Sequence, residues 1–207
     1  MRVDRFIHRH GATPDWHWYD AALFSVAAQA IRLGLGALVR SIRGASVSPR
    51  AVMEQDATYT ADLRQPFFAP PGVAFAPTWT FNNICSLWAA MRVLRLPPDT
   101  PGRQEYLSSQ AASWLLFVSF DALYAGLRSP INGAGCTLAY FALTVRSIRV
   151  ARSRLDDPKL ALALVPLLIW LLLAGATAIA QALWNRDELY SVGPLLTPAS
   201  RWIKHDR

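Results

Sequence analysis

Long intervals with few or no charged residues alternate with short polar stretches along this chain of 207 residues. About 20 consecutive apolar residues are enough for a helix to cross the hydrocarbon core of a membrane. The clearest interval, Leu160–Asn185, has 26 residues without a charge. Four more intervals have suitable length: Ala21–Val39, Phe75–Arg92, Tyr106–Leu127 and Pro130–Arg149. The pattern predicts an all-α fold, an integral membrane bundle of five transmembrane helices. Four spans with an interfacial first helix are the alternative, because Arg32 and two glycines weaken the first interval.

The segment between the first two predicted spans is rich in proline. Residues 65–91 form a run of 27 without Asp, Glu, Lys or Arg. Its first half contains Pro66, Pro70 and Pro71, each of which lacks a backbone donor and disfavours helix at the preceding residue. The sequence therefore predicts an extended first loop that passes into a helix near Phe75, with Pro77 in the first turn.

Composition supports a membrane environment. Hydrophobic residues make up 53% of the chain and charged residues 17%, and the polar termini dilute a more apolar middle. We expect a polar and aromatic extension at 1–20, a membrane domain at 21–186 and a polar tail at 187–207. The net charge of +7 is typical of contact with membrane lipids rather than with nucleic acid. These features predict a multi-pass integral membrane protein.

Eight tryptophans are present; Trp184 stands at the end of the last predicted span, and four others lie within spans: Trp79, Trp88, Trp114 and Trp170. An indole offers a flat face for stacking and one N–H donor. Each of the four can serve ordinary helix packing or the wall of a ligand site.

Other chemistry is sparse in the sequence. Asp121 is the one carboxylate well inside a predicted span, where it could transfer protons, pair with Arg32 or be satisfied by a neighbouring helix. The two cysteines lie in apolar runs and are interpreted as packing residues. The histidines, His8, His10, His17 and His205, lie outside the spans, and no cysteine or carboxylate cluster completes a metal site. No catalytic residues are predicted.

Two ordered motifs resemble those of the tryptophan-rich sensory protein / translocator protein (TspO/MBR) family. The first runs from Tyr59 to Gly72 as YTADLRQPFFAPPG and continues with PTWT at 77–80. The family's first loop reads approximately W-Y-x-x-L-x-K-P-x-x-x-P-P, followed by P-x-W-T. In the last predicted span, PLLIW at 166–170 is similar to the family's P-Y-L-x-W, with Ala174 on a family alanine and Trp184-Asn185 at the end. The resemblance covers roughly residues 21–186 and marks a divergent member.

Several positions depart from the family's pattern. Tyr59 stands for the loop tryptophan, Gln65 for the lysine, and Asn82-Asn83 for a leucine-tyrosine pair. In the third helix only Gln110 and the run at 126–128 are similar. The natural ligand can therefore differ from that of other members.

The resemblance implies a membrane-embedded binding protein for tetrapyrroles, such as protoporphyrin IX or haem, with a sensory, regulatory or transport-linked role. No cofactor is obligatory in this interpretation. The candidate ligand-binding residues are Trp79, Trp170, Ala174, Asn82, Asn83, Gln110, Pro71 and Arg64. Arg64, or Arg40 and Arg43 in the same loop, could meet porphyrin propionates at the mouth of the site.

Two other functions compete with this one. The chain could be a non-enzymatic structural or assembly subunit of a larger membrane complex. A porphyrin-degrading activity has been proposed for the family, but no acid–base pair supports it here. A homodimer is plausible through Gly133, Ala134 and Gly135, whose small side chains allow close helix packing.

Overall fold

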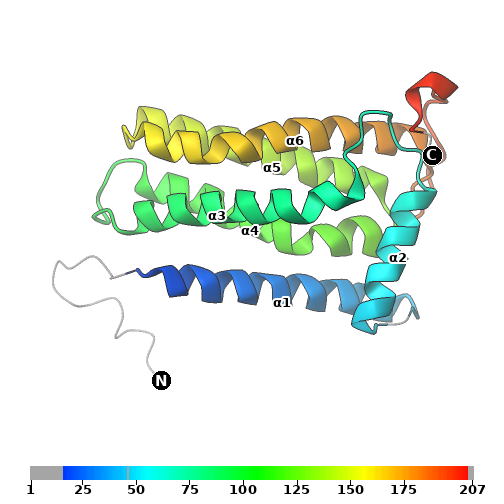
Figure 1. Cartoon of the computed structure of the whole chain (residues 1–207), viewed down its shortest axis with the longest axis horizontal. Coiled ribbons are helices and arrows are strands. Elements are labelled where there is room, and N and C mark those ends of the chain that lie inside the picture. Colours follow the sequence, from blue (N-terminus) through cyan, green and yellow to red (C-terminus); the bar gives the residue numbers. More distant parts are fainter. Residues whose placement is uncertain (1–15, 46, 205–207) are drawn as a thin grey trace.

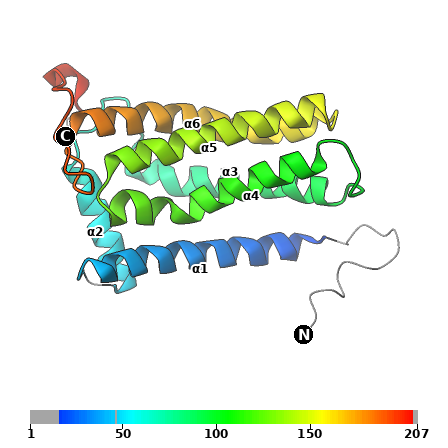
Figure 2. The same cartoon turned by 180° about the vertical axis from the view of Figure 1, so that it is seen from behind.

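The protein is an all-helical bundle, seen here in a computed structural model that describes residues 16–45 and 47–204. Five long helices lie side by side, and a shorter helix, α2, runs across one end of the bundle (Figure 1). The long helices are α1 (Trp18–Ile42), α3 (Phe75–Leu94), α4 (Arg103–Asp121), α5 (Pro130–Ser153) and α6 (Pro158–Trp184). The view from behind shows α4 and α5 in front of α3 and α6, with α1 at the edge (Figure 2). The described residues contain no β-sheet, only two isolated bridges.

Each of the five predicted spans falls on one long helix, so the all-α prediction is confirmed. Among the residues that the structure describes, two helices, α1 and α6, are long and apolar enough by composition to cross a membrane. The number of spans remains a prediction, as does the alternative of an interfacial first helix.

Helix α2 (Pro49–Asp62) was not predicted. Counting charge-free intervals overlooks a polar helix, and this one carries four charged side chains. Its signals were nevertheless present. Ser48-Pro49 is a typical helix start, and Tyr59 and Leu63 are four residues apart at its end, where both are buried against Tyr124.

The proline-rich segment is extended, as predicted, and α3 begins at Phe75 after a short 3₁₀ turn, η2 (Gly72–Ala74). Its backbone is held from two sides. Asn185, at the end of α6, accepts from the amide of Arg64 at 2.7 Å and donates to its carbonyl at 3.2 Å. The C-terminal tail pairs with the next residues, through Phe67 N to Trp202 O at 2.9 Å and Lys204 N to Gln65 O at 2.8 Å.

The turn from α4 to α5 is tightly packed. Helix α4 continues as a π-helical turn, η3 (Ala122–Gly126), and Ser129 caps α5 by accepting from the Asn132 amide at 3.1 Å. Gly133 lies against the ring of Tyr124, and a Cβ placed on it would be 2.6 Å from Tyr124 Cδ2. Close packing was predicted for this stretch, and it holds at Gly133. At Gly135 an added Cβ would have no neighbour within 4 Å.

At the other end of the bundle, Asp157 connects the end of α3 to the start of α6. Its side chain accepts from the Lys159 amide at 3.0 Å and from Arg92 Nε at 2.5 Å. Burial alone would raise the pKa of this carboxyl, but the hydrogen bonds from Arg92 and Lys159 outweigh it and hold the pKa below its ordinary value.

The arrangement of the loops predicts sidedness in the membrane. Residues near 50, 129 and 195 lie at one end of the bundle, and residues near 100 and 155 lie at the other (Figure 1). In a variant without native cysteines, single cysteines at Arg50 and Thr197 should label from one side, and cysteines at Asp99 and Ser153 from the other. Labelling of positions 50 and 99 from the same side would contradict five spans.

Two glycine substitutions test the packing of α5. Gly133→Ala should destabilise the protein by about 1–3 kcal/mol, because the new methyl group collides with Tyr124. Gly135→Ala is the matched control on the same helix, where alanine should raise stability by up to about 1 kcal/mol. Thermal unfolding in detergent measures both. Equal effects would show that Gly133 is not a packing contact.

Candidate ligand-binding cavity

A cavity of about 540 Å³ lies between the long helices, in the half of the bundle nearer the proline-rich segment. All five long helices contribute to its lining, which is mostly apolar and aromatic. The size and character are those of a small-molecule site, in which a few polar groups orient a ligand within apolar walls.

Trp79 is the centre of the aromatic wall. Its ring centroid lies 5.4 Å from that of Phe117, 6.0 Å from that of Tyr140 and 6.5 Å from that of Trp170. Phe75, one turn before Trp79, packs edge-on against Trp170 at 5.2 Å. The wall is therefore built from α3, α4, α5 and α6, and its rings are fixed by contacts with one another.

Trp170, on α6, is 7% exposed and forms part of the cavity wall. Its indole N–H makes no hydrogen bond within the part of the chain that the structure describes. Ala174 follows one helical turn later and also lines the cavity, so a small side chain leaves space beside the indole. Pro166, one turn earlier, lies inside α6, where it removes one helical hydrogen bond.

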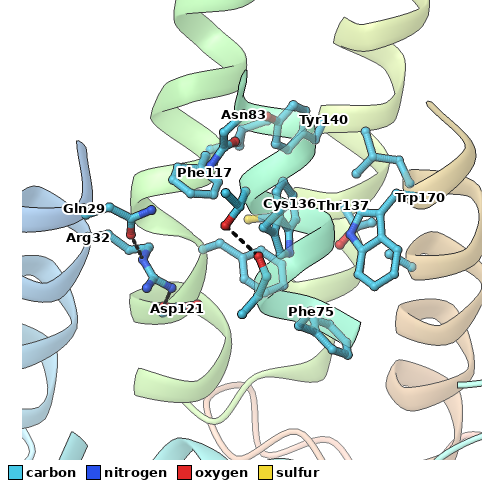
Figure 3. Close-up of a pocket in the computed structure, with 17 residues that line it drawn as sticks. Gln29, Arg32, Phe75, Asn83, Phe117, Asp121, Cys136, Thr137, Tyr140 and Trp170 are labelled. Atoms are coloured by element: carbon cyan, nitrogen blue, oxygen red, sulfur yellow. Dashed lines mark hydrogen bonds and ion pairs between the residues drawn. The ribbon is translucent and has the colours of Figure 1, made fainter. Parts of the chain in front are cut away.

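The opposite side of the cavity is polar. Gln29 and Arg32 project from α1, and Asp121 is the last residue of α4 (Figure 3). Arg32 Nη1 donates to Asp121 Oδ2 at 2.5 Å, which confirms the pairing that the sequence suggested as one option. Asn83, on α3, adds an amide to the lining.

Four of the eight predicted ligand-binding residues line this cavity: Trp79, Trp170, Ala174 and Asn83. They come from two helices that contact each other, α3 and α6. The structure therefore brings Trp79 of the first motif to the same cavity as Trp170 and Ala174 of the second.

The other four predicted residues do not line the cavity. Asn82 is 1% exposed, and neither of its side-chain polar atoms has a partner among the described residues. Gln110 donates to Ser147 Oγ at 3.0 Å within a helix interface. Pro71 is exposed at the start of η2, and Arg64 is outside the bundle with its Nη1 3.5 Å from the Trp184 carbonyl.

The other cations proposed for the mouth of the site are also engaged elsewhere. Arg43 bonds to the Gly126 carbonyl at 3.1 Å and to Glu188 at 3.2 Å. Arg40 is 3% exposed and lies outside the lining. His8, His10 and His205 lie outside the described residues, so the structure says nothing of a metal there.

The remaining two tryptophans of the predicted spans have different surroundings. Trp114 is buried between Phe24, at 4.9 Å, and Phe117, at 5.2 Å, and lines neither cavity. Trp88 is 47% exposed and lines a second, more open cavity of about 940 Å³ between the first half of α1 and the second half of α3. The two cavities share three lining residues: Gln29, Thr80 and Asn83.

Sequence reasoning missed several lining residues, among them Phe75, Phe117, Cys136, Thr137 and Tyr140. The spacing of Phe75 and Trp79 places them on one face of α3, which was a usable signal. Tyr140 and Thr137 lie three residues apart on α5, where no motif of the family resemblance had been assigned. Their place in the cavity depends on how α5 packs against α6.

Comparison with known proteins assigns the chain to a family. The model of the TspO/MBR family matches residues 33–184. No curated protein matches the sequence at a significant level. The matched region begins inside α1, includes the proline-rich segment and both tryptophans of the aromatic wall, and ends with the last residue of α6. Because it covers most of the chain, the match shows that the chain belongs to the TspO/MBR family.

Proposed function

We propose that the protein binds tetrapyrroles such as protoporphyrin IX or haem, or similar flat hydrophobic molecules, in the cavity between its long helices. The observation that carries the proposal is the aromatic wall, in which Trp79 and Trp170 from two family motifs meet across one cavity. Membership in a family of membrane proteins linked to tetrapyrrole binding or transport supports the same ligand class.

The cavity suits a flat ligand with polar edges. Six aromatic residues of the lining supply ring faces and edges: Phe75, Trp79, Phe117, Phe120, Tyr140 and Trp170. A planar macrocycle can stack on such rings. The charged groups, Arg32 and Asp121, lie with Gln29 on the side of α1 and the end of α4, where the edge of a ligand would find donors and acceptors. Its output would be sensory, regulatory or transport-linked.

An assembly role is the second candidate, and one observation favours it. The tail after α6 exposes large apolar side chains at one end of the bundle: Tyr190, Leu195, Leu196 and Trp202. Such a patch suits a partner subunit, and it also suits the headgroup region of a membrane. Co-purification distinguishes the functions, because a coloured species with a porphyrin absorption band supports binding, whereas a stoichiometric complex with other chains supports assembly.

Four tryptophan substitutions test where the ligand binds. Trp79→Leu and Trp170→Leu keep apolar volume but remove the ring face and the N–H. Each should weaken protoporphyrin IX binding by about threefold to tenfold, which corresponds to about 0.5–1.5 kcal/mol of lost stacking. The measurement is a fluorescence titration of all variants in the same detergent.

Trp114→Leu and Trp88→Leu are the matched controls. The first removes a buried ring outside both cavities, and the second alters only the second cavity. Thermal unfolding, measured in parallel, separates loss of binding from loss of the fold. A larger effect of Trp88→Leu than of Trp79→Leu would move the site to the second cavity. Failure of the unmodified protein to bind porphyrin would favour the assembly role.

A further inference from the structure

A single ion pair lies in the lining of the candidate cavity. Arg32 is the one cation and Asp121 the one anion among the residues that the structure describes as lining it. Their side chains are 33% and 32% exposed, so each is partly open to the cavity. A charge surrounded mostly by apolar groups is costly unless it is paired, and the ion pair with Asp121 therefore compensates the charge of Arg32 and holds its side chain in place.

Only some of the N–H donors of the Arg32 guanidinium bind other residues of the described chain. Its Nε donates to Gln29 Oε1 at 2.9 Å, and its Nη1 donates to Asp121 Oδ2. Within the described chain, Nη2 makes no hydrogen bond, and Asp121 Oδ1 accepts none. An arginine has five N–H donors in a planar fork. Asp121 therefore engages one edge through a single oxygen, and donors remain for a second acceptor.

Gln29 restricts the orientation of the Arg32 guanidinium. By accepting from Nε, it fixes the plane of the guanidinium on α1 (Figure 3). A carboxylate is the acceptor that matches such a fork, because two oxygens can take two parallel N–H groups. The ion pair lies on the opposite side of the cavity from Trp170, so an anionic edge of a ligand can meet Arg32 while its ring system meets the aromatic wall.

The geometry points to Arg32 as the anchor for a carboxylate of the bound ligand, with Asp121 as its resident counter-ion. This inference rests on the proposed function, and it narrows the ligand class to flat hydrophobic acids, such as tetrapyrroles with a free propionate. A bound carboxylate shares the guanidinium with Asp121, and the two negative groups repel each other. Asp121 thus keeps the empty site stable and limits the affinity for anionic ligands.

The test compares protoporphyrin IX with its dimethyl ester, which has the same ring system but no carboxylate. The unmodified protein should bind the free acid more tightly than the ester. Arg32→Gln should weaken binding of the acid by about tenfold, the scale of one hydrogen bond to a charged group, and leave the ester unchanged. Asp121→Asn should tighten binding of the acid and leave the ester unchanged.

Two further variants distinguish the loss of a ligand contact from damage to the fold. The double variant Arg32→Gln/Asp121→Asn has no uncompensated charge and should bind acid and ester equally. Arg146→Gln is the matched control, because it removes one arginine from another interhelical pair, 3.2 Å from Glu105 and outside the cavity. It should bind both ligands as the unmodified protein does.

The outcomes separate this inference from the proposed function. If the unmodified protein binds neither ligand, the proposed function fails. If it binds both and Arg32→Gln changes neither affinity, Arg32 is not the anchor. If Arg32→Gln weakens acid and ester equally, Arg32 acts by holding α1 in place, and the inference is likewise overturned.

Discussion

The constraint on which this structure depends is that backbone polar groups in an apolar environment need partners within the protein. Helices meet it by themselves. The proline-rich segment between α2 and α3 does not, because three prolines prevent a helix there. Asn185 and the C-terminal tail supply the missing partners by bonding to Arg64, Gln65 and Phe67. Gln181, one turn before Asn185, adds a bond to the Gln65 side chain at 2.7 Å.

Fixing this segment also fixes the cavity. The segment leads through η2 into Phe75, which packs on Trp170, and Trp79 follows one turn later. The end of α6 thus holds the proline-rich segment in place, and the middle of the same helix packs against Phe75, the first residue of α3. The turn after α4 has a related effect, because Tyr124 in η3 donates to Gln181 at 2.8 Å and packs on Gly133. Asp121 lies immediately before that turn, where α4 ends.

Much of this fold could be predicted from the sequence. Intervals with few or no charged residues located the five long helices, since apolar runs of that length suit membrane-spanning helices. The prolines defined the extended segment, and the two motifs placed Trp79 and Trp170 in one site. Helix α2 was missed because its charges resemble those of a loop when only apolar runs are counted.

The candidate site was predictable only in part. Asn82 and Asn83 were both expected to line the site, although adjacent residues on a helix point in different directions, and only Asn83 does. Gln110 was suggested by its similarity to the family's third helix, but its side chain donates to Ser147 Oγ in a helix interface instead. Arg64 was expected at the mouth because it lies in the motif, whereas the cation in the cavity is Arg32, from a helix whose angle to the bundle no local pattern specifies.

The two native cysteines show whether the ligand lies in this cavity. Cys136 lines the cavity, and Cys85, on α3, lines neither cavity; both thiols are free and partly exposed. The measurement is the rate of alkylation at each cysteine by a small apolar reagent, with and without saturating protoporphyrin IX, read by mass spectrometry. If the ligand lies in this cavity, bound porphyrin should slow the alkylation of Cys136 and leave that of Cys85 unchanged. Bound porphyrin that leaves Cys136 as reactive as before, or that protects Cys85 instead, would contradict it.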